Sequence, residues 1–264
     1  MMQNAVTWLF VPGSRPERFA KAAGAGADVV IVDLEDAVPA DAKAAARENL
    51  RSAWPIGYSV AVRINGRSSP EFDDDVALCR ELGPAAVILP KTESAQDVEV
   101  TAEATGSPVL GLVETARGFV NLGEICAAPG LVRLVFGSID LALDLGVTGD
   151  AALDTSRSDL VRWSAACRLP SPLDGVTPSI NDTEAVERDS RRAKEWGFGG
   201  KLCIHPAQLP VVRDAMRPSP EDVAWARRVV EADAQALGAA VSLDGAMIDR
   251  PVVERARRLL RAAD

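Results

Sequence analysis

Eight short segments rich in valine, isoleucine and leucine recur along the whole chain, and they constrain the fold more than any other feature. They cover residues 7–13, 28–36, 58–66, 85–91, 108–115, 131–140, 172–179 and 199–206. Each segment is almost continuously apolar rather than alternating, which is typical of parallel strands buried on both faces. The stretches between them are typical of helices: residues 39–53 keep alanine and leucine on one face, and residues 94–106 open on serine and close on glycine. Repeated strand-plus-helix units predict an α/β TIM (β/α)8 barrel rather than an open sheet with a second domain.

The chain continues beyond what an eighth barrel helix needs. Residues 219–238 form a capped amphipathic pattern, followed by a short extended stretch, a turn at Asp244–Gly245 and a final helix that starts near Pro251. We therefore expect a catalytic barrel over residues 1–216 and a helical C-terminal arm over residues 217–264. The arm either caps the barrel surface or covers an active site, its own or that of a neighbouring subunit.

Composition narrows the classes of partner. The 264 residues fit one barrel of about 250 residues. The net charge is -9 and no basic stretch offsets it, which argues against nucleic acid as a partner. The four cysteines form no CxxC pair, so neither a disulfide framework nor a thiolate zinc site is expected. No signal-peptide pattern and no membrane-length apolar run is present, so we expect a soluble, cytoplasmic protein.

Polar residues follow most of the predicted strands at the point where the apolar run ends. In a TIM barrel this end of the strands, with the loops that follow, carries the catalytic groups. Each residue alone could be a solvated loop side chain, but their agreement across the strands predicts one shared site. The set is Arg15, Glu35, Asp36, Arg63, Asn65, Lys91, Glu114, Thr115, Ser138, Asp140 and His205.

Glu114 and Asp140 are the candidate metal ligands. Each follows an apolar run closely, so we expect each carboxylate to be held at a rigid strand end. Two carboxylates with water and substrate oxygens suit Mg²⁺. The alternative is a structural carboxylate that caps the next helix. Zinc is disfavoured, because the single histidine is His205 and no cysteine belongs to the set of residues at the strand ends.

Arg63 lies within a predicted strand, where a buried guanidinium needs a carboxylate partner. It either pairs with Glu35 or Asp36 of the preceding strand or binds a substrate carboxylate, and both can hold because a protein carboxylate can orient the arginine. Asp33 is expected to be structural, since neighbouring strand residues point to opposite faces. Gly137 is small enough for main-chain N–H groups to approach an anionic oxygen.

Several stretches together resemble the citrate lyase beta-subunit-like family within the HpcH/HpaI aldolase superfamily. They are "LFVPGSRPERFAKA", "DVVIVDLEDAVPADAKAAAR", "VRIN", "VILPKTES", "GLVETARGF", "VFGSIDLALDLG", "GKLCIHPAQ" and "DGAMIDRPVVERAR". They cover nearly the whole chain in the family's order. The resemblance implies a TIM barrel, usually assembled as a homotrimer, that cleaves or forms 3-hydroxyacyl-CoA thioesters by Claisen-type chemistry with Mg²⁺.

The resemblance also implies roles for individual residues at the metal and substrate. Glu114 and Asp140 match the family's metal ligands, and Arg63 matches the arginine that binds the carboxylate of the oxo acid. Glu35 and Asp36 match acidic residues that hold the metal's waters.

The same resemblance assigns residues further from the metal. Asp249 matches a catalytic aspartate that a neighbouring subunit delivers on its C-terminal arm. The first loop and the "IHP" turn match regions that contact coenzyme A or the acyl substrate, although Pro16 and Glu17 interrupt the basic pattern of that loop. The residues implied are Arg15, Lys21, Ile204 and His205. His205 is alternatively a general base or a structural residue.

The function that follows is a Mg²⁺-dependent carbon–carbon lyase acting on citramalyl-CoA, malyl-CoA or citryl-CoA, with acetyl-CoA and a 2-oxo acid as the small-molecule partners. Mg²⁺ would polarise the substrate hydroxyl, and Arg63 with the Gly137 and Ser138 amides would hold the adjacent carboxylate. Asp249 would exchange a proton with the methyl carbon of acetyl-CoA.

Three alternatives stay open at this point. One is a subunit of a citrate lyase complex that acts on citryl-acyl carrier protein. Another is an aldolase for free 4-hydroxy-2-oxo acids, although such relatives commonly place histidine near the metal and this chain offers only His205. The third is a metabolite-binding barrel without catalysis.

Overall fold

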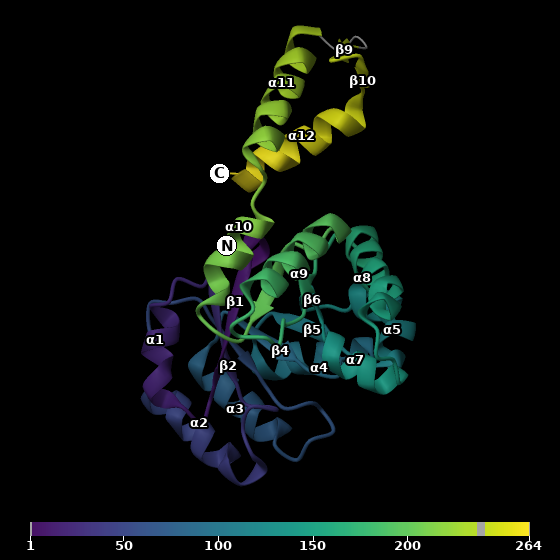
Figure 1. Ribbon diagram of the computed structural model, residues 1–264. Coiled ribbons are helices and arrows are strands. Elements are labelled where there is room, and N and C mark those ends of the chain that lie inside the picture. The colour runs from purple at the N-terminus through teal and green to yellow at the C-terminus, as the bar shows by residue number, and fades with distance from the viewer. Residues whose placement is uncertain (1, 237–240, 264) are drawn as a thin grey trace. The chain divides into compact units, whose positions relative to one another are not determined.

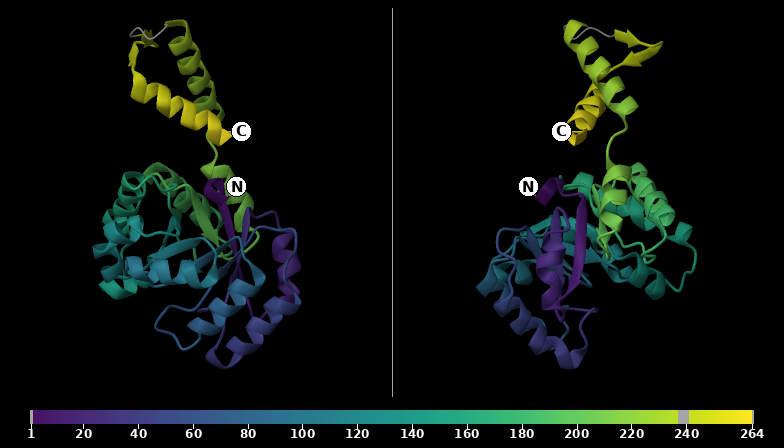
Figure 2. Two further views of the ribbon diagram at one scale, coloured as in Figure 1. Left: turned by 180° about the vertical axis from the view of Figure 1, so that it is seen from behind. Right: turned by 60° about the vertical axis from the view of Figure 1, so that its left-hand side comes forward.

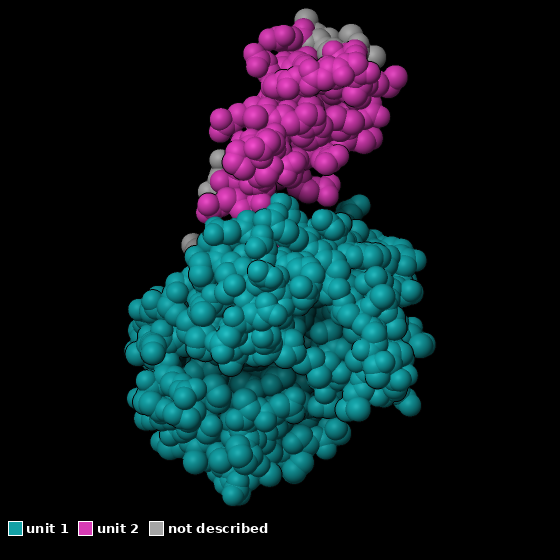
Figure 3. Space-filling view, in the orientation of Figure 1, with its two compact units in different colours: residues 1–215 teal, residues 216–264 magenta. Residues whose placement is uncertain are grey.

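The computed structural model describes residues 2–236 and 241–263 and divides the chain into two compact units. Unit 1 spans Met1–Ala215 and unit 2 spans Met216–Asp264, and Figure 3 colours them separately. Each unit has a hydrophobic cluster of its own.

Unit 1 is a closed barrel of eight parallel strands, each paired with the next and the last paired with the first. Its strands are β1 (Thr7–Pro12), β2 (Val29–Asp33), β3 (Val60–Arg63), β4 (Ala86–Leu89), β5 (Val109–Val113), β6 (Leu131–Phe136), β7 (Leu173–Asp174) and β8 (Gly200–Cys203). Figures 1 and 2 show the helices outside this ring of strands. The predicted TIM barrel is confirmed.

Helices follow the strands of the barrel in turn. They are α1 (Phe19–Ala23), α2 (Lys43–Ser52), α3 (Phe72–Leu82), α4 (Ala95–Thr105), α5 (Ala116–Val120), α6 (Leu122–Ala127), α7 (Ser138–Leu145), α8 (Asp154–Ala166), α9 (Thr183–Trp196) and α10 (Gln208–Met216). Short 3₁₀ turns lie at Met2–Asn4, Pro16–Arg18, Ala40–Ala42 and Asp150–Leu153. The predicted caps of α4 are confirmed: the Ser94 side chain accepts a hydrogen bond from the Asp97 N–H, and Gly106 has a φ of 68°.

The barrel interior is filled by alternate residues of the strands. Large apolar side chains such as Trp8, Ile31 and Leu110 are almost completely buried there. Near the carboxyl ends of the strands the same inward positions are taken by charged residues, including Asp33 and Arg63. The apolar layers therefore support a polar layer at the end where TIM barrels carry their sites.

Unit 2 pairs α11 (Pro220–Ala236) with α12 (Arg250–Ala263), joined by a hairpin of β9 (Val241–Leu243) and β10 (Ala246–Ile248). The hairpin turn has φ values of 54° at Asp244 and 82° at Gly245, as a tight two-residue turn requires. The predicted turn and final helix are confirmed, while residues 237–238 of the predicted 219–238 helix lie outside the described residues. The predicted role of this unit as an arm over an active site stays a prediction.

Candidate active site

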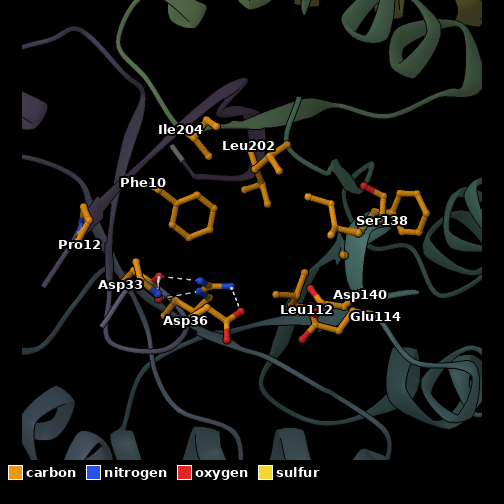
Figure 4. A pocket seen from close by; sticks show the side chains of 16 residues that line it. Phe10, Pro12, Asp33, Asp36, Leu112, Glu114, Ser138, Asp140, Leu202 and Ile204 are labelled. Atoms are coloured by element: carbon orange, nitrogen blue, oxygen red, sulfur yellow. Dashed lines mark hydrogen bonds and ion pairs between the residues drawn. The ribbon is translucent and has the colours of Figure 1, made fainter. Parts of the chain in front are cut away.

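A cavity of about 500 Å³ lies at the carboxyl ends of the barrel strands (Figure 4). It brings together many of the residues that the sequence predicted for the site. Those that line it are Asp36, Arg63, Glu114, Gly137, Ser138, Asp140 and Ile204. Their convergence from separate strands and loops makes this cavity the candidate active site.

Arg63, the last residue of β3, is held by Asp33, the last residue of β2. Arg63 Nε donates to Asp33 Oδ1 at 2.7 Å and Nη2 donates to Oδ2 at 2.6 Å, which is the strong two-bond arrangement of an arginine–carboxylate pair. The two residues are register partners on adjacent parallel strands. The sequence predicted that Glu35 and Asp36 orient Arg63 and that Asp33 is structural. The structure shows that Asp33 is its main partner, because the strand register sets them side by side.

Two more carboxylates lie near the same guanidinium. Glu35 Oε2 is 3.0 Å from Arg63 Nη1, and Asp36 Oδ2 is 3.7 Å from it. The ring of Phe10 covers the guanidinium, with Cζ 4.9 Å from the ring centroid. Burial alone would lower the pKa of Arg63, but the carboxylates outweigh it and raise that pKa above its ordinary value.

Lys91 follows β4 and contacts two acidic residues of the site, although the sequence assigned it no particular role. Its main-chain N–H donates to Glu114 Oε1 at 2.9 Å, and its Nζ donates to Glu35 Oε1 at 2.8 Å. Its φ of 49° is unusual for a residue with a side chain. Burial raises the pKa of the Glu35 carboxyl, although Arg63 and Lys91 both oppose that rise. The strand-end pattern placed Lys91 in the predicted site, but it could not give these partners, because both contacts are to residues that follow other strands.

Glu114 follows β5 directly and is 2% exposed. Burial raises its pKa to about 8, and the nearby Glu35 and Asp140 carboxylates contribute to this rise. Gly137 leaves the space that this side chain fills, since a Cβ on Gly137 would lie 2.6 Å from Glu114 Oε2 and 2.3 Å from its Cβ. Glycine at position 137 is therefore a requirement of the Glu114 position.

Asp140 lies in the first turn of α7, three residues into the segment after Gly137, rather than at the end of β6, which stops at Phe136. The expectation that it is held directly at a strand end was wrong. Its side chain nevertheless lines the cavity beside Glu114 (Figure 4). The helix N-terminus presents this carboxylate, because α7 begins immediately where the strand meets the cavity.

The side chains of this cavity fit a hard divalent cation. Within residues 2–236 and 241–263, no cavity-lining side chain is a histidine or cysteine, and no group of three or more His, Cys, Asp and Glu side chains is arranged to hold a metal. Glu114 and Asp140 offer only two protein oxygen ligands. Mg²⁺ accepts such a site, because it keeps several waters and binds substrate oxygens in its other positions. A cation between them would also relieve the repulsion that raises the pKa of Glu114.

The residues predicted for coenzyme A contact lie in different places. Ile204 lines the cavity, whereas Arg15, Lys21 and His205 are exposed and do not line it. Arg15 Nε donates to Glu17 Oε1 at 2.6 Å, so Glu17 partly neutralises the first loop.

Asp249 belongs to unit 2. There its Oδ1 accepts a hydrogen bond from the Val252 N–H at 3.1 Å, as a residue that caps α12 does. Its predicted catalytic role stays a prediction.

The fold and cavity define a class of protein: a TIM barrel with a pair of buried or half-buried carboxylates beside a carboxylate-bound arginine. Residues 7–206 match the model of the HpcH/HpaI aldolase/citrate lyase family, and the chain belongs to that family. Among the described residues, no helix is both long and apolar enough to cross a membrane.

Known proteins resemble the chain over nearly its full length. It is 42% identical to a citrate lyase subunit beta-like protein of Mycobacterium tuberculosis, over 97% of this chain and 94% of that protein. A solved structure of CitE from M. tuberculosis with magnesium, acetoacetate and coenzyme A matches it with a TM-score of 0.89 and 41% identity, over 99% of each chain. A citrate lyase beta subunit from M. tuberculosis solved with oxaloacetate and magnesium matches with a TM-score of 0.75 and 40% identity, over 83% of this chain and all of that one.

Proposed function

We propose that the protein is a Mg²⁺-dependent carbon–carbon lyase that cleaves or forms a 3-hydroxyacyl-CoA thioester such as citramalyl-CoA, malyl-CoA or citryl-CoA. The products of cleavage are acetyl-CoA and a 2-oxo acid. The observation that carries the proposal is the convergence of Glu114, Asp140 and Arg63 on one cavity. Membership of the family and the likeness to a protein solved with magnesium, acetoacetate and coenzyme A support it.

Arg63 would bind the substrate carboxylate next to the carbon that carries the hydroxyl. Its Nε and one Nη2 hydrogen point at Asp33, which fixes the plane of the guanidinium. Glu35 lies 3.0 Å from Nη1, so the remaining edge of the guanidinium is left for a ligand. The main-chain N–H groups of Ser138 and Ile139 begin α7 at the same cavity and favour a negative oxygen. Fixing the carboxylate at both places would hold the scissile bond in one orientation.

Glu114 and Asp140 would hold Mg²⁺, which supplies Lewis-acid polarisation of the substrate oxygens when bound. Gly137 keeps Glu114 in place, and the Lys91 N–H fixes one of its oxygens. Glu35 Oε2 is buried and lies 3.0 Å from Arg63 Nη1, with no hydrogen bond within the described residues. Because its side chain does not line the cavity, Glu35 would accept through a water the proton that leaves as the substrate hydroxyl becomes the ketone of the 2-oxo acid.

The other half of the reaction needs a proton at the methyl carbon of acetyl-CoA. We assign this exchange to Asp249, delivered on the C-terminal arm of a neighbouring subunit in a cytoplasmic homotrimer. Contacts to coenzyme A are assigned to Ile204 at the cavity and to Arg15, Lys21 and His205 around it. These assignments rest on the sequence motifs that this chain shares with the family.

The test supplies each of the three thioesters with Mg²⁺ and measures acetyl-CoA and free coenzyme A separately by chromatography. We expect acetyl-CoA and the 2-oxo acid in equal amounts, and loss of the reaction on chelation of the metal or in Glu114→Gln. Glu124→Gln is the matched control, because Glu124 is exposed on α6, outside the barrel. Absence of cleavage, or release of free coenzyme A in place of acetyl-CoA, would contradict the proposal.

A further inference from the structure

The charges around the cavity are strongly unequal. Of the residues that the structure describes, Arg63 is the one cation whose side chain lines it. Four carboxylates line it as well: Asp33, Asp36, Glu114 and Asp140. A divalent cation would offset part of this negative charge, but a second anionic group on a substrate would still need a cation of the protein.

Cations close to the cavity already have partners elsewhere. Lys91 Nζ is 2.8 Å from Glu35, and Lys201 Nζ is 2.7 Å from Asp174 in the barrel wall. Lys43 donates to the Leu34 and Glu35 carbonyls and to Asn65, and Arg157 pairs with Asp150 and Asp154. Arg15 pairs with Glu17. None of these five side chains lines the cavity.

Arg63 itself has capacity for one carboxylate. Two of its five N–H groups are on Asp33, the ring of Phe10 covers one face, and Glu35 already lies 3.0 Å from Nη1. The remaining edge of the Arg63 guanidinium can therefore bind one ligand carboxylate and no more. A second carboxylate on the same substrate would face either protein carboxylates or apolar groups.

The rest of the wall is apolar. It is formed by Phe10, Leu112, Phe136, Val176, Leu202 and Ile204. In Figure 4 the labelled Leu202 and Ile204 lie on the side of the cavity away from Asp36 and Glu114, whereas Leu112 lies close to Glu114. The side of Leu202 and Ile204 is therefore the apolar side of the cavity. An alkyl group gains free energy against such a wall, whereas a carboxylate there loses its hydration without a partner.

We infer that the acid half of the substrate carries a single carboxylate and an alkyl substituent on the hydroxyl-bearing carbon, so that the 2-oxo acid released is a pyruvate-like monocarboxylate rather than oxaloacetate. This inference rests on the proposed lyase function. The M. tuberculosis relatives include one solved with oxaloacetate and one solved with pyruvate, so the family alone does not select the acid. The inference rests on the apolar wall of the cavity and on the cations that already have partners.

The first experiment compares kcat/KM for citramalyl-CoA, malyl-CoA and citryl-CoA at saturating Mg²⁺. Their hydroxyl-bearing carbons carry a methyl group, a hydrogen and a carboxymethyl group. We expect citramalyl-CoA to exceed malyl-CoA, and to exceed citryl-CoA by about tenfold or more, the usual size of discrimination in an apolar pocket. Equal or better use of citryl-CoA would overturn the inference.

A second readout does not depend on turnover. Calorimetry with Mg²⁺ compares the affinities of pyruvate and 2-oxobutanoate with that of freshly dissolved oxaloacetate. If no thioester is cleaved, the proposed function fails, but these affinities still decide the inference: tighter pyruvate and 2-oxobutanoate support it, and tighter oxaloacetate refutes it.

A pair of variants separates charge from shape. Val176 is one of the apolar residues that line the cavity, so Val176→Lys should supply the missing cation. It should reduce the preference for citramalyl-CoA over citryl-CoA by about tenfold relative to the neutral Val176→Met. If either variant does not fold, Ile204→Lys and Ile204→Met test the same point at a more exposed position. Equal narrowing by lysine and methionine would show that shape, rather than charge, selects the substrate, and would overturn the inference.

Discussion

Two buried arginines at opposite ends of the barrel are stabilised in opposite ways. Arg63, at the carboxyl end of β3, lies among Asp33, Glu35 and Asp36. Arg133, near the start of β6, is 2% exposed and has no ion pair within the described residues. Its Nε donates to the Ser171 carbonyl at 2.7 Å, and its Nη1 donates to the Ala5 and Met2 carbonyls at 2.9 and 3.4 Å.

The pKa values of the two arginines shift in opposite directions, because only Arg63 has carboxylates beside it. Burial lowers the pKa of Arg133 to about 10, because carbonyl dipoles replace water without supplying a negative charge. The carboxylates around Arg63 raise its pKa instead. Arg133 therefore serves as a structural donor that links β6 to the segments preceding β7 and β1. Arg63, in contrast, is part of a charge network that a ligand can enter. The difference follows the division of TIM barrels into a stabilising end and a functional end.

The largest effect is expected at Arg63. Arg63→Met leaves the buried Asp33 without its cation and Glu35 with Lys91 alone, which should cost about 3 to 5 kcal/mol of unfolding free energy and reduce kcat/KM of the proposed reaction by about 100-fold or more. Chemical denaturation and steady-state kinetics measure the two effects. Arg63→Lys should recover part of the stability but little activity, because lysine cannot make the two-bond contact with Asp33. If Arg63→Met loses less stability than Arg133→Met, the expected difference between the two arginines is contradicted.

Arg133→Met should lower stability by about 2 kcal/mol, since it removes the donor to the Ser171 carbonyl and leaves the Ala5 carbonyl with Trp8 Nε1 alone. The activity per folded molecule should not change, because Arg133 lies at the other end of the barrel from the cavity. The same denaturation and kinetic measurements apply. A loss of kcat/KM in a folded Arg133→Met protein would show that the two ends are coupled.

Metal-free protein should lose stability as pH rises, because of Glu114. The folded-state pKa of about 8 lies above the ordinary value of 4.5, so the folded protein binds this proton more tightly than the unfolded chain. Stability therefore falls as pH rises from about 4.5 to about 8, by about 2 kcal/mol between pH 6.5 and 8. Denaturation midpoints of wild type and Glu114→Gln in a chelator measure this fall, which the variant should lack. An identical pH dependence in both proteins would contradict the expectation, and added Mg²⁺ should reduce the fall in the wild type.

The smallest effect is expected at Lys91. Its ammonium is half-exposed, so Lys91→Met should cost only about 0.5 to 1 kcal/mol, and high salt should reduce that cost. The main-chain N–H that binds Glu114 remains in the variant, so the pH dependence assigned to Glu114 should persist. Loss of that dependence in Lys91→Met would mean that the ammonium, rather than the backbone, holds the Glu114 carboxylate. Denaturation at two salt concentrations and two pH values makes both measurements.

Local patterns in the sequence were sufficient for the barrel and for part of the site. The continuous apolar runs predicted the parallel strands, Ser94 and Gly106 predicted the ends of α4, and Asp244–Gly245 predicted the hairpin turn. These features depend on residues close together in the chain. Glu114 could be placed at its strand end for the same reason, since the residue directly after a buried strand has little freedom in where it lies.

The partners within the cavity were decided only by the tertiary structure. Asp33 and Arg63 are 30 residues apart, and only the register between β2 and β3 sets them opposite one another. The raised pKa of Glu114 likewise depends first on its burial in the folded barrel and then on Glu35 and Asp140, which are distant in the sequence. Hydrophobic periodicity determines which residues form strands and which way they face. Charge pairing, however, falls off steeply with distance through space, so it becomes fixed only when the closed barrel sets the distances between its strand ends.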